Sequence, residues 1–371
     1  MTVSRRAGGG YTSAMIDLGL MFGGRSAEHE VSVASARSLY GALDRDKYDI
    51  IPIGIMRDGA WVRPLDVDLA LRDGLDGVAV EPVALNPDPT QPPLLVGEER
   101  RPVELDVVFT VLHGTYGEDG TVQGALEIAD VAYTGSGVAA SGAAMDKGMM
   151  KSLFAAAGLP QVDYLVLRDV GYDEAAAVAQ VEAGFDFPVF VKPANLGSSV
   201  GITKAHDSEE LVESLRLAFR YDRKIVVEAF ADAREIECAV LGNDAPQASL
   251  PGEVMPVNEF YDYESKYTDG MMSFAIPADL SREQTDEVRA LAVAAFKAVD
   301  GSGFARCDFF VYRDEGPVMV NEINTTPGLT DMSAFPKLWA ASGVPYAELA
   351  DRIVSLALER HRAKGSLLTS R

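Results

Sequence analysis

Runs of apolar residues separated by glycine-rich turns dominate the first third of the chain. One of these runs ends at Gly23-Gly24 and another ends at His113-Gly114. Their lengths and spacing predict strands at 15–22, 49–56 and 106–112 and helices at 30–43 and 119–128. Strand, glycine-rich loop, helix and strand in succession are typical of an open, parallel α/β sheet, in which ligands gather at the carboxyl ends of the strands.

The pattern of hydrophobic and polar residues changes near Asp146. From there on, amphipathic helices are separated by short strands. We predict helices at 147–157, 208–219, 281–299 and 345–362 and strands at 187–192, 224–230 and 234–241. A hairpin is expected between Ala305 and Gly328. The segment 253–275 is aromatic and polar with little periodicity, and such a long loop in a globular chain is usually functional or disordered.

These changes divide the chain into three regions, and the predicted fold class is α/β, or α+β overall. Residues 1–145 form an N-terminal α/β domain behind a loose leader at 1–14. Residues 146–240 form a central subdomain and 241–371 a C-terminal domain. The segment 65–101, rich in proline, glycine and aspartate, is interpreted as an insertion of uncertain structure.

Composition narrows the possible partners. The 371 residues are 47% hydrophobic and carry a formal net charge of −23, which argues against a general role on nucleic acid or an anionic membrane. Cys238 and Cys307 lie in apolar runs, and we interpret both as buried thiols rather than as disulfide or metal ligands. The absence of a signal-peptide pattern and of a long apolar run favours a reduced, cytoplasmic setting.

Two acids interrupt the apolar strands of the predicted hairpin, Asp308 in the first strand and Glu322 in the second. A three-residue loop with Gly316 in the left-handed position sets Asp308 opposite Glu322 and Arg306 opposite Asn324. Since side chains alternate along a strand, all four share one face, where opposed like charges repel. A bridging cation resolves that repulsion, and carboxylate and amide oxygens are the ligands that Mg²⁺ prefers. The alternative is a structural network in which Arg306 alone neutralises the acids.

Two lysines are candidate phosphate ligands. Lys192 ends a strand just before the glycine-rich stretch Gly-Ser-Ser-Val-Gly, whose backbone amides could cradle a phosphate. Lys147 stands at a helix start, where a cation is unfavourable unless an anion is near. The alternatives are a common glycine-rich turn and an ordinary surface lysine. Together with the hairpin, the lysines suggest chemistry on a magnesium nucleotide.

Several stretches, in order, resemble the D-alanine–D-alanine ligases of the ATP-grasp superfamily. They are GGRSAEHEVS, LHGTYGEDGTVQG, YTGSG, MDK, VKPANLGSSVG, FYDYESKY and NEINTTPG, and the resemblance extends from about Leu18 to Leu358. It implies an ATP-grasp fold and ligation of two D-alanine molecules, with ATP and two Mg²⁺ ions as cofactors, for which Mn²⁺ can substitute. It also implies a role in peptidoglycan precursor synthesis and a homodimer. The alternative within the superfamily is a D-alanine–D-lactate ligase or another carboxylate ligase.

The resemblance also implies roles for individual residues. The ions would be held by Asp308, Glu322 and Asn324, and the reaction's oxyanion by Arg306. Glu28 would bind the ammonium of the first D-alanine, and Ser333 would orient the carboxylate of the second. The residues expected to bind ATP are Lys147 and Lys192 at the phosphates, Lys266 at the γ-phosphate, Glu228, Ala229, Phe230 and Ala231 around the adenine, and Glu235 at the ribose.

The long loop at 253–275 would close over the site and exclude water. Ser198, Tyr267 and Glu28 are expected to form the hydrogen-bonded group that latches it. Relatives that make D-alanyl-D-lactate lack the tyrosine, so Tyr267 favours an amine as the nucleophile. The contrasting class, a nucleotide-binding regulatory protein without turnover, is disfavoured by the presence of Arg306, Asp308, Glu322 and Asn324 together.

Overall fold

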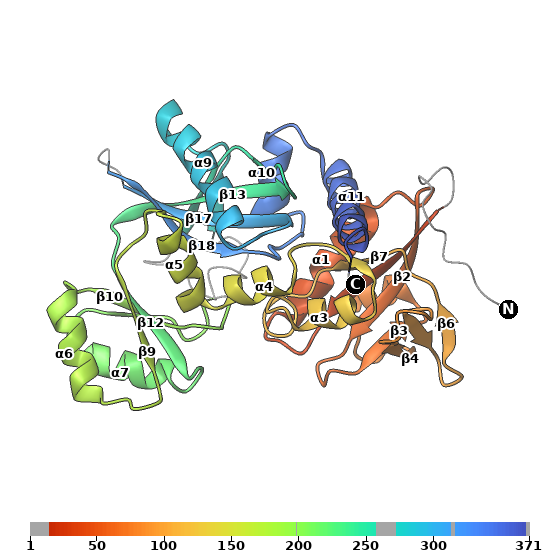
Figure 1. Cartoon of the computed structure of the whole chain (residues 1–371), viewed down its shortest axis with the longest axis horizontal. Coiled ribbons are helices and arrows are strands. Elements are labelled where there is room, and N and C mark those ends of the chain that lie inside the picture. The colour runs from red at the N-terminus through yellow and green to blue at the C-terminus, as the bar shows by residue number, and fades with distance from the viewer. Residues whose placement is uncertain (1–14, 198, 257–271, 313–315, 369–371) are drawn as a thin grey trace.

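A computed structural model describes residues 15–197, 199–256, 272–312 and 316–368. The chain folds around three sheets (Figure 1), with the N-terminal sheet at one end of the molecule, a small central sheet at the other, and the C-terminal sheet between and above them. None of the helices in the described part of the chain has the length and apolar character to cross a bilayer.

The N-terminal sheet has eight strands in the order β6-β5-β4-β3-β2-β1-β7-β8. Neighbours are parallel from β2 to β8, which matches the predicted open sheet, and antiparallel from β2 to β6. The strands are β1 (Ile16–Gly23), β2 (Tyr48–Ile55), β3 (Trp61–Pro64), β4 (Val80–Leu85), β5 (Leu94–Val96), β6 (Arg101–Val103), β7 (Val107–Thr110) and β8 (Ala132–Tyr133). The helices of this region are α1 (His29–Ala42), α2 (Val67–Asp73), α3 (Thr121–Ile128) and α4 (Val138–Met145).

The segment 65–101, whose structure the sequence left uncertain, is ordered. It contributes α2 and the strands β4 and β5, and with β6 it extends the parallel part of the sheet as an antiparallel ribbon. The edge strand β6 is only three residues long and begins with an exposed arginine, a common way to limit edge-to-edge pairing.

The central sheet is antiparallel, in the order β11-β10-β12-β9. Its strands are β9 (Tyr164–Arg168), β10 (Val189–Pro193), β11 (Thr203–Ala205) and β12 (Lys224–Ala229), with helices α5 (Lys147–Ala156), α6 (Glu174–Gly184) and α7 (Ser208–Ala218). Valines from β10 and β12 and leucines from α7 form one separate core under this sheet, and α6 and α7 cover one of its faces (Figure 1).

The C-terminal sheet is ordered β16-β15-β13-β17-β18, and β14 pairs with β13 off that path. Its strands are β13 (Ala233–Gly242), β14 (Gln247–Ala248), β15 (Gly252–Pro256), β16 (Met272–Ala275), β17 (Gly303–Tyr312) and β18 (Val318–Asn324). Its helices are α9 (Arg282–Ala298), α10 (Ala334–Ala341) and α11 (Tyr346–Gly365). The predicted loop 253–275 therefore begins and ends as strand, because β15 and β16 pair with each other. Residues 257–271 lie outside the described residues.

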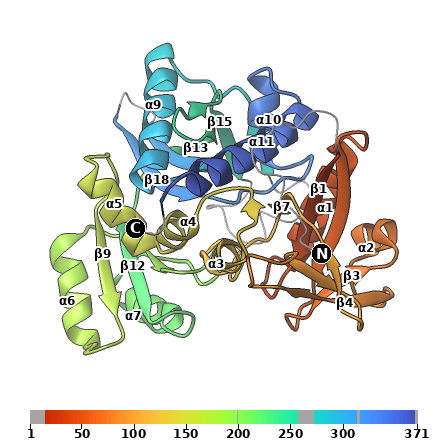
Figure 2. The ribbon, with the colours of Figure 1, turned by 45° about the vertical axis from the view of Figure 1, so that its right-hand side comes forward.

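One hydrophobic core joins the beginning and the end of the chain. Leu18 and Phe109 of the N-terminal sheet share a cluster with Leu338 of α10 and Leu349 of α11, and Figure 2 shows α11 lying between the two regions. At its border the buried Tyr48 hydroxyl donates a hydrogen bond of 2.7 Å to Asp351 Oδ1 of α11. The N-terminal sheet is thus packed directly against the C-terminal helices.

The predicted hairpin pairs are confirmed, but the register near the turn is not the expected one. Asp308 faces Glu322 and Arg306 faces Asn324, whereas Phe309 faces Val320. One residue of β18, Asn321, is therefore extra. This bulge lies between the turn and the pair Asp308 and Glu322, whose face of the hairpin is called the metal face below because the sequence predicts a metal there. Without it, the alternation that buries Val320 would also turn Glu322 toward the core.

The bond between Tyr48 and Asp351 gives a stability prediction. Removing the hydroxyl in Tyr48→Phe should lower the free energy of unfolding by about 2 kcal/mol, because a charge-assisted hydrogen bond between two regions is lost. Urea unfolding measures the difference. Lys47→Met, which removes the exposed ion pair with the other Asp351 oxygen, is the control and should cost less than about 1 kcal/mol, so an equal loss in both variants would contradict the assignment.

Candidate active site

A row of carboxylates crosses three neighbouring strands of the C-terminal sheet. Glu237 of β13 is directly opposite Asp308 of β17, and Asp308 is directly opposite Glu322 of β18. On β17 the alternate residues Cys307 and Phe309 are buried, so the acids lie on the face opposite the core. Both cysteines are fully buried, as predicted, and burial raises the pKa of the Cys238 thiol to about 12.

Arg306 is the cation that lies against this row. Its Nε and Nη2 donate to the two Asp308 oxygens at 2.7 and 2.6 Å, and Nε also lies 3.2 Å from Glu237 Oε1. The structural network predicted as the alternative, in which Arg306 neutralises the acids, is therefore present for Asp308 and Glu237. Glu322 meets a different cation, since Lys147 Nζ lies 3.7 Å from its Oε2.

Lys147 is the first residue of α5 and is not an ordinary surface lysine, because it is 9% exposed. Asp146 caps the helix by accepting from Met149 N, and Lys147 Nζ donates to Leu196 O at 3.0 Å. The residue thus links α5, the glycine-rich stretch after β10, and the metal hairpin. A cation at a helix N-terminus is unfavourable by itself, and Glu322 at 3.7 Å compensates for it.

Lys192 and Glu228 form the centre of a buried charge cluster on the face of the central sheet opposite its apolar core. Lys192 Nζ lies 2.6 Å from one Glu228 oxygen, and Lys151 Nζ of α5 lies 3.1 Å from the other. Burial alone would raise the pKa of Glu228, but the two lysines outweigh it and lower the pKa to about 2. Burial likewise lowers the pKa of Lys192, yet Glu228 reverses the effect and the pKa is raised. For Lys151 burial prevails, and its pKa lies below the ordinary value.

The segment expected to bind the adenine joins the central and C-terminal sheets. Glu228 and Ala229 end β12, Phe230 and Ala231 lie in the link, and Glu235 follows on β13. Phe230 is 39% exposed and lies 6.3 Å, ring to ring, from Phe190. An exposed aromatic ring at this link is suited to holding a flat base.

Glu28 and His113 lie where the N-terminal sheet meets the site. Glu28 is the N-cap of α1, but its side chain makes no capping hydrogen bond. Side chains placed on Gly114 and Gly197 would come within 2.7 and 3.3 Å of its Oε2, so the carboxylate lies between two glycine turns. Simple helix capping therefore does not explain Glu28.

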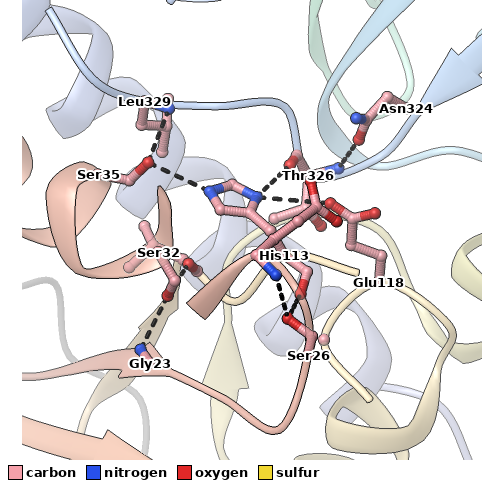
Figure 3. A network of polar contacts seen from close by, with 12 residues as sticks. Gly23, Ser26, Ser32, Ser35, His113, Glu118, Asn324, Thr326 and Leu329 are labelled. Carbon is pink, nitrogen blue, oxygen red and sulfur yellow. Dashed lines mark hydrogen bonds and ion pairs between the residues drawn. The ribbon is translucent and has the colours of Figure 1, made fainter. Parts of the chain in front are cut away.

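His113 belongs to a buried network (Figure 3). Its Nδ1 donates to Thr326 O at 3.0 Å and lies 3.5 Å from Glu118 Oε1, while Nε2 is 3.2 Å from Ser35 Oγ. Burial lowers the pKa of His113, but the hydrogen bond and charge of Glu118 outweigh it, so the pKa is raised. The histidine thereby ties the loop after the metal hairpin to the end of β7.

Ser333 is at the N-cap of α10 and makes no side-chain capping bond. Its Oγ instead lies 2.8 Å from Thr330 Oγ1, in a tight turn that includes Gly328. The amide groups at the start of α10 are therefore not capped by Ser333, and a helix N-terminus favours a carboxylate.

Three predicted site residues, Ser198, Lys266 and Tyr267, lie outside the described residues. Among the others, three pairs are in contact: Lys147 with Glu322, Lys192 with Glu228, and Arg306 with Asp308. Sequence reasoning missed Lys151 and Glu237. Glu237 carries the same signal as Asp308, an acid inside an apolar strand, whereas Lys151 is four residues after Lys147 on the same helix face.

The donor set fits a hard divalent ion only in part. Asp308, Glu322 and Asn324 provide carboxylate and amide oxygens on one face, although Asn324 Oδ1 already accepts from Thr326 N at 2.8 Å. Across the described ranges no three His, Cys, Asp or Glu side chains are grouped closely enough to hold an ion by themselves. Magnesium commonly keeps water and takes substrate phosphate oxygens in addition to one or two carboxylates, so the set suits an ion that arrives with a nucleotide.

Solved structures with this arrangement of sheets are ATP-grasp ligases, and the fold of this chain is an ATP-grasp fold. The D-alanine-D-alanine ligase of Coxiella burnetii is 35% identical with a TM-score of 0.83, over 95% of this chain and 96% of that one. The VanG D-Ala:D-Ser ligase of Enterococcus faecalis is 33% identical with a TM-score of 0.85, over 93% of this chain and 100% of that one.

Sequence comparison defines the family. The models of the D-ala D-ala ligase N-terminus and C-terminus match residues 17–136 and 153–355. The D-alanine–D-alanine ligase of Bacillus licheniformis is 49% identical over 94% of this chain and 97% of its own length. That of Acetivibrio thermocellus is 46% identical over 92% and 96%. The chain belongs to the D-alanine–D-alanine ligase family, as the sequence motifs indicate.

The charge cluster around Glu228 predicts a pH dependence. Because the pKa of this carboxylate is about 2 rather than 4.5, its contribution to stability is complete above about pH 4.5 and is lost as the pH falls toward 2. Over that interval it amounts to on the order of 3 kcal/mol. The double variant Lys151→Met, Glu228→Gln keeps the cluster's net charge and should lack this component.

Urea unfolding of both proteins at a series of pH values from 5 to 2 measures it. Other carboxylates titrate in both proteins, so the difference isolates Glu228. If the two proteins lose stability in parallel over this range, the assigned pKa is wrong.

Proposed function

We propose that this protein joins two D-alanine molecules into D-alanyl-D-alanine at the expense of ATP, through an acyl phosphate, for peptidoglycan precursor synthesis. The observation that carries the proposal is the pairing of Asp308 with Glu322 on the face of the sheet opposite the core, with Lys147 3.7 Å from Glu322, in a chain of this family. Acids on neighbouring strands repel unless a cation comes between them, and a nucleotide-bound ion would do so.

The nucleotide would lie between the central and C-terminal sheets. Lys147 and Lys192 would hold its phosphates, together with Lys266, and each of the two described lysines has an acid as its present partner. Glu228 is held ionised by two lysines, which suits it to accept a hydrogen bond from an amino group on the base. The backbone from Ala229 to Ala231 would flank the base, with Phe230 beside it.

The metal face would neutralise charge on the phosphoryl group. Asp308, Glu322 and Asn324 would hold two Mg²⁺ ions, or Mn²⁺ in their place, which supply Lewis-acid stabilisation of the transferring phosphoryl group. Glu322 would contribute to holding both ions, as the family resemblance implies. Glu235, on the same side of β13 as Glu237, would bind the ribose.

The amino acids would lie toward the N-terminal sheet. Glu28, held between two glycine turns, would bind the ammonium of the first D-alanine. The guanidinium of Arg306 would stabilise the oxyanion formed when the second amine attacks. The turn of Ser333 at the start of α10 would receive the carboxylate of the second D-alanine. Ser198, Tyr267 and Glu28 would latch the loop that excludes water from the acyl phosphate.

A second candidate differs only in the nucleophile. One structural relative is a D-Ala:D-Ser ligase with a TM-score of 0.85, and a D-alanine–D-lactate ligase would need the same metal face. Tyr267 favours D-alanine over D-lactate. Assays with D-alanine, D-serine and D-lactate as competing second substrates distinguish the three. We further propose a cytoplasmic homodimer that binds neither nucleic acid nor membrane, consistent with the formal charge of −23.

The direct test is release of ADP. With D-alanine, ATP and Mg²⁺ the protein should release ADP and form D-alanyl-D-alanine in equal amounts, and chelation of the metal should stop both. A coupled assay measures ADP, and chromatography measures the dipeptide. Binding of ATP without release of ADP would instead indicate a nucleotide-binding protein without turnover.

Glu322→Gln tests the metal face. Turnover should fall by at least about a thousandfold, which corresponds to roughly 4 kcal/mol of lost transition-state stabilisation. The fold should persist, because Glu322 is partly exposed and its charge faces that of Asp308. Glu348→Gln, which breaks an exposed ion pair on α11, is the control. Near-normal turnover of Glu322→Gln would reject the assigned role.

A further inference from the structure

The carboxylate row contains one acid more than the proposed metal face requires. Glu237 lies directly opposite Asp308 on the side away from Glu322, so Asp308 is the middle member of the row. Strands are about 4.8 Å apart, which places Glu237 and Glu322 about 10 Å apart along the row. An ion between Glu322 and Asp308 would lie on the far side of Asp308 from Glu237, whose Oε1 is 3.2 Å from Arg306 Nε. Glu237 therefore has another task.

Arg306 and a metal ion would compete for the same carboxylate. In the described structure both oxygens of Asp308 accept hydrogen bonds from Arg306, at 2.7 and 2.6 Å. A divalent cation bound to Asp308 repels the guanidinium and takes lone pairs that the arginine now uses. Loading of the metal on Asp308 thus requires Arg306 to give up at least part of this two-pronged contact.

When the Arg306 guanidinium gives up its contact with Asp308, another carboxylate has to balance its charge. The Arg306 side chain is only 15% exposed, and a largely buried cation that loses its partner is strongly unfavourable. The Glu237 side chain is more buried than that of Arg306, with only 5% exposed. Its Oε1 already lies 3.2 Å from Arg306 Nε. A small rotation about the end of the arginine side chain would exchange Asp308 for Glu237 without moving either strand.

We propose that Glu237 is a positioning residue that takes over Arg306 when Asp308 turns to the metal. The exchange would release the two Asp308 oxygens from Arg306 so that they can contact an ion beside Glu322, and it keeps the guanidinium on the face where the oxyanion would form. This inference rests on the proposed function, because it assumes that Asp308 is a metal ligand. It adds that the affinity for the metal depends on a carboxylate that does not touch it.

The test measures metal binding directly, without turnover. Electron paramagnetic resonance counts free Mn²⁺ in the presence of a non-hydrolysable ATP analogue, for the wild type and for Glu237→Gln. In the variant Arg306 should stay on Asp308, and Mn²⁺ affinity should fall about tenfold, as expected for loss of one charge-assisted hydrogen bond. Glu174→Gln, which removes a carboxylate bound in the same two-pronged way to Arg216 on the central subdomain, should leave it unchanged.

A double-mutant cycle separates this role from simple attraction between Glu237 and the ion. If Glu237 acts through Arg306, then in an Arg306→Met background the change Glu237→Gln should alter Mn²⁺ affinity less than about twofold. If the tenfold loss persists in that background, Glu237 acts by its charge alone and the proposal is overturned. Wild-type affinity in Glu237→Gln itself overturns it as well.

Two further measurements keep the result interpretable. If Glu237→Gln fails to fold by circular dichroism, Glu237→Asp replaces it, since its carboxylate is one methylene short of Arg306. This variant should lose affinity severalfold, and wild-type affinity would overturn the proposal. Failure of the proposed function is distinct: the wild type would then bind no Mn²⁺ with the nucleotide analogue, or would release no ADP with D-alanine.

Discussion

Repulsion between carboxylates on adjacent strands is the constraint on which the site depends. Glu237, Asp308 and Glu322 lie side by side on one face of the C-terminal sheet, and each must be balanced by a positive charge. Arg306 balances one end of the row and Lys147, from the central subdomain, approaches the other. The pairing of the two regions is therefore partly electrostatic, and it leaves the gap between Asp308 and Glu322 as the natural position for an added cation.

The same logic holds in the central subdomain with the signs reversed. There a single acid, Glu228, is shared between Lys151 and Lys192, so the cluster carries one positive charge in excess. An excess of lysine beside an excess of carboxylate forms a field that suits a polyanion carrying a divalent ion. The chain is strongly acidic as a whole, so local placement of a few lysines, rather than net charge, produces this preference.

Much of this arrangement could be predicted from the sequence, because acids inside apolar strands are costly and therefore informative. The alternation of residues around Asp308 and Glu322 was enough to predict their pairing. It could not reveal the bulge at Asn321. A regular hairpin with a three-residue loop and a bulged hairpin with a shifted turn both place Asp308 opposite Glu322. Lys151 remained hidden because a lysine on a helix is usually exposed, and only packing against β12 buries it. The ribbon of β4 to β6 was also missed, because short edge strands rich in proline lack clear alternation.

The core shared by β1 and α11 has a consequence for how this protein is made. Leu18 leaves the ribosome well before its packing partners in α10 and α11, because Leu338 follows it by 320 residues. At about 5–20 residues per second, roughly 15 to 60 seconds separate the two. During that interval the N-terminal sheet exposes the apolar surface that α11 later covers. Newly made chains therefore pass through a period in which they are vulnerable to aggregation and proteolysis, and in which chaperones would have a surface to bind.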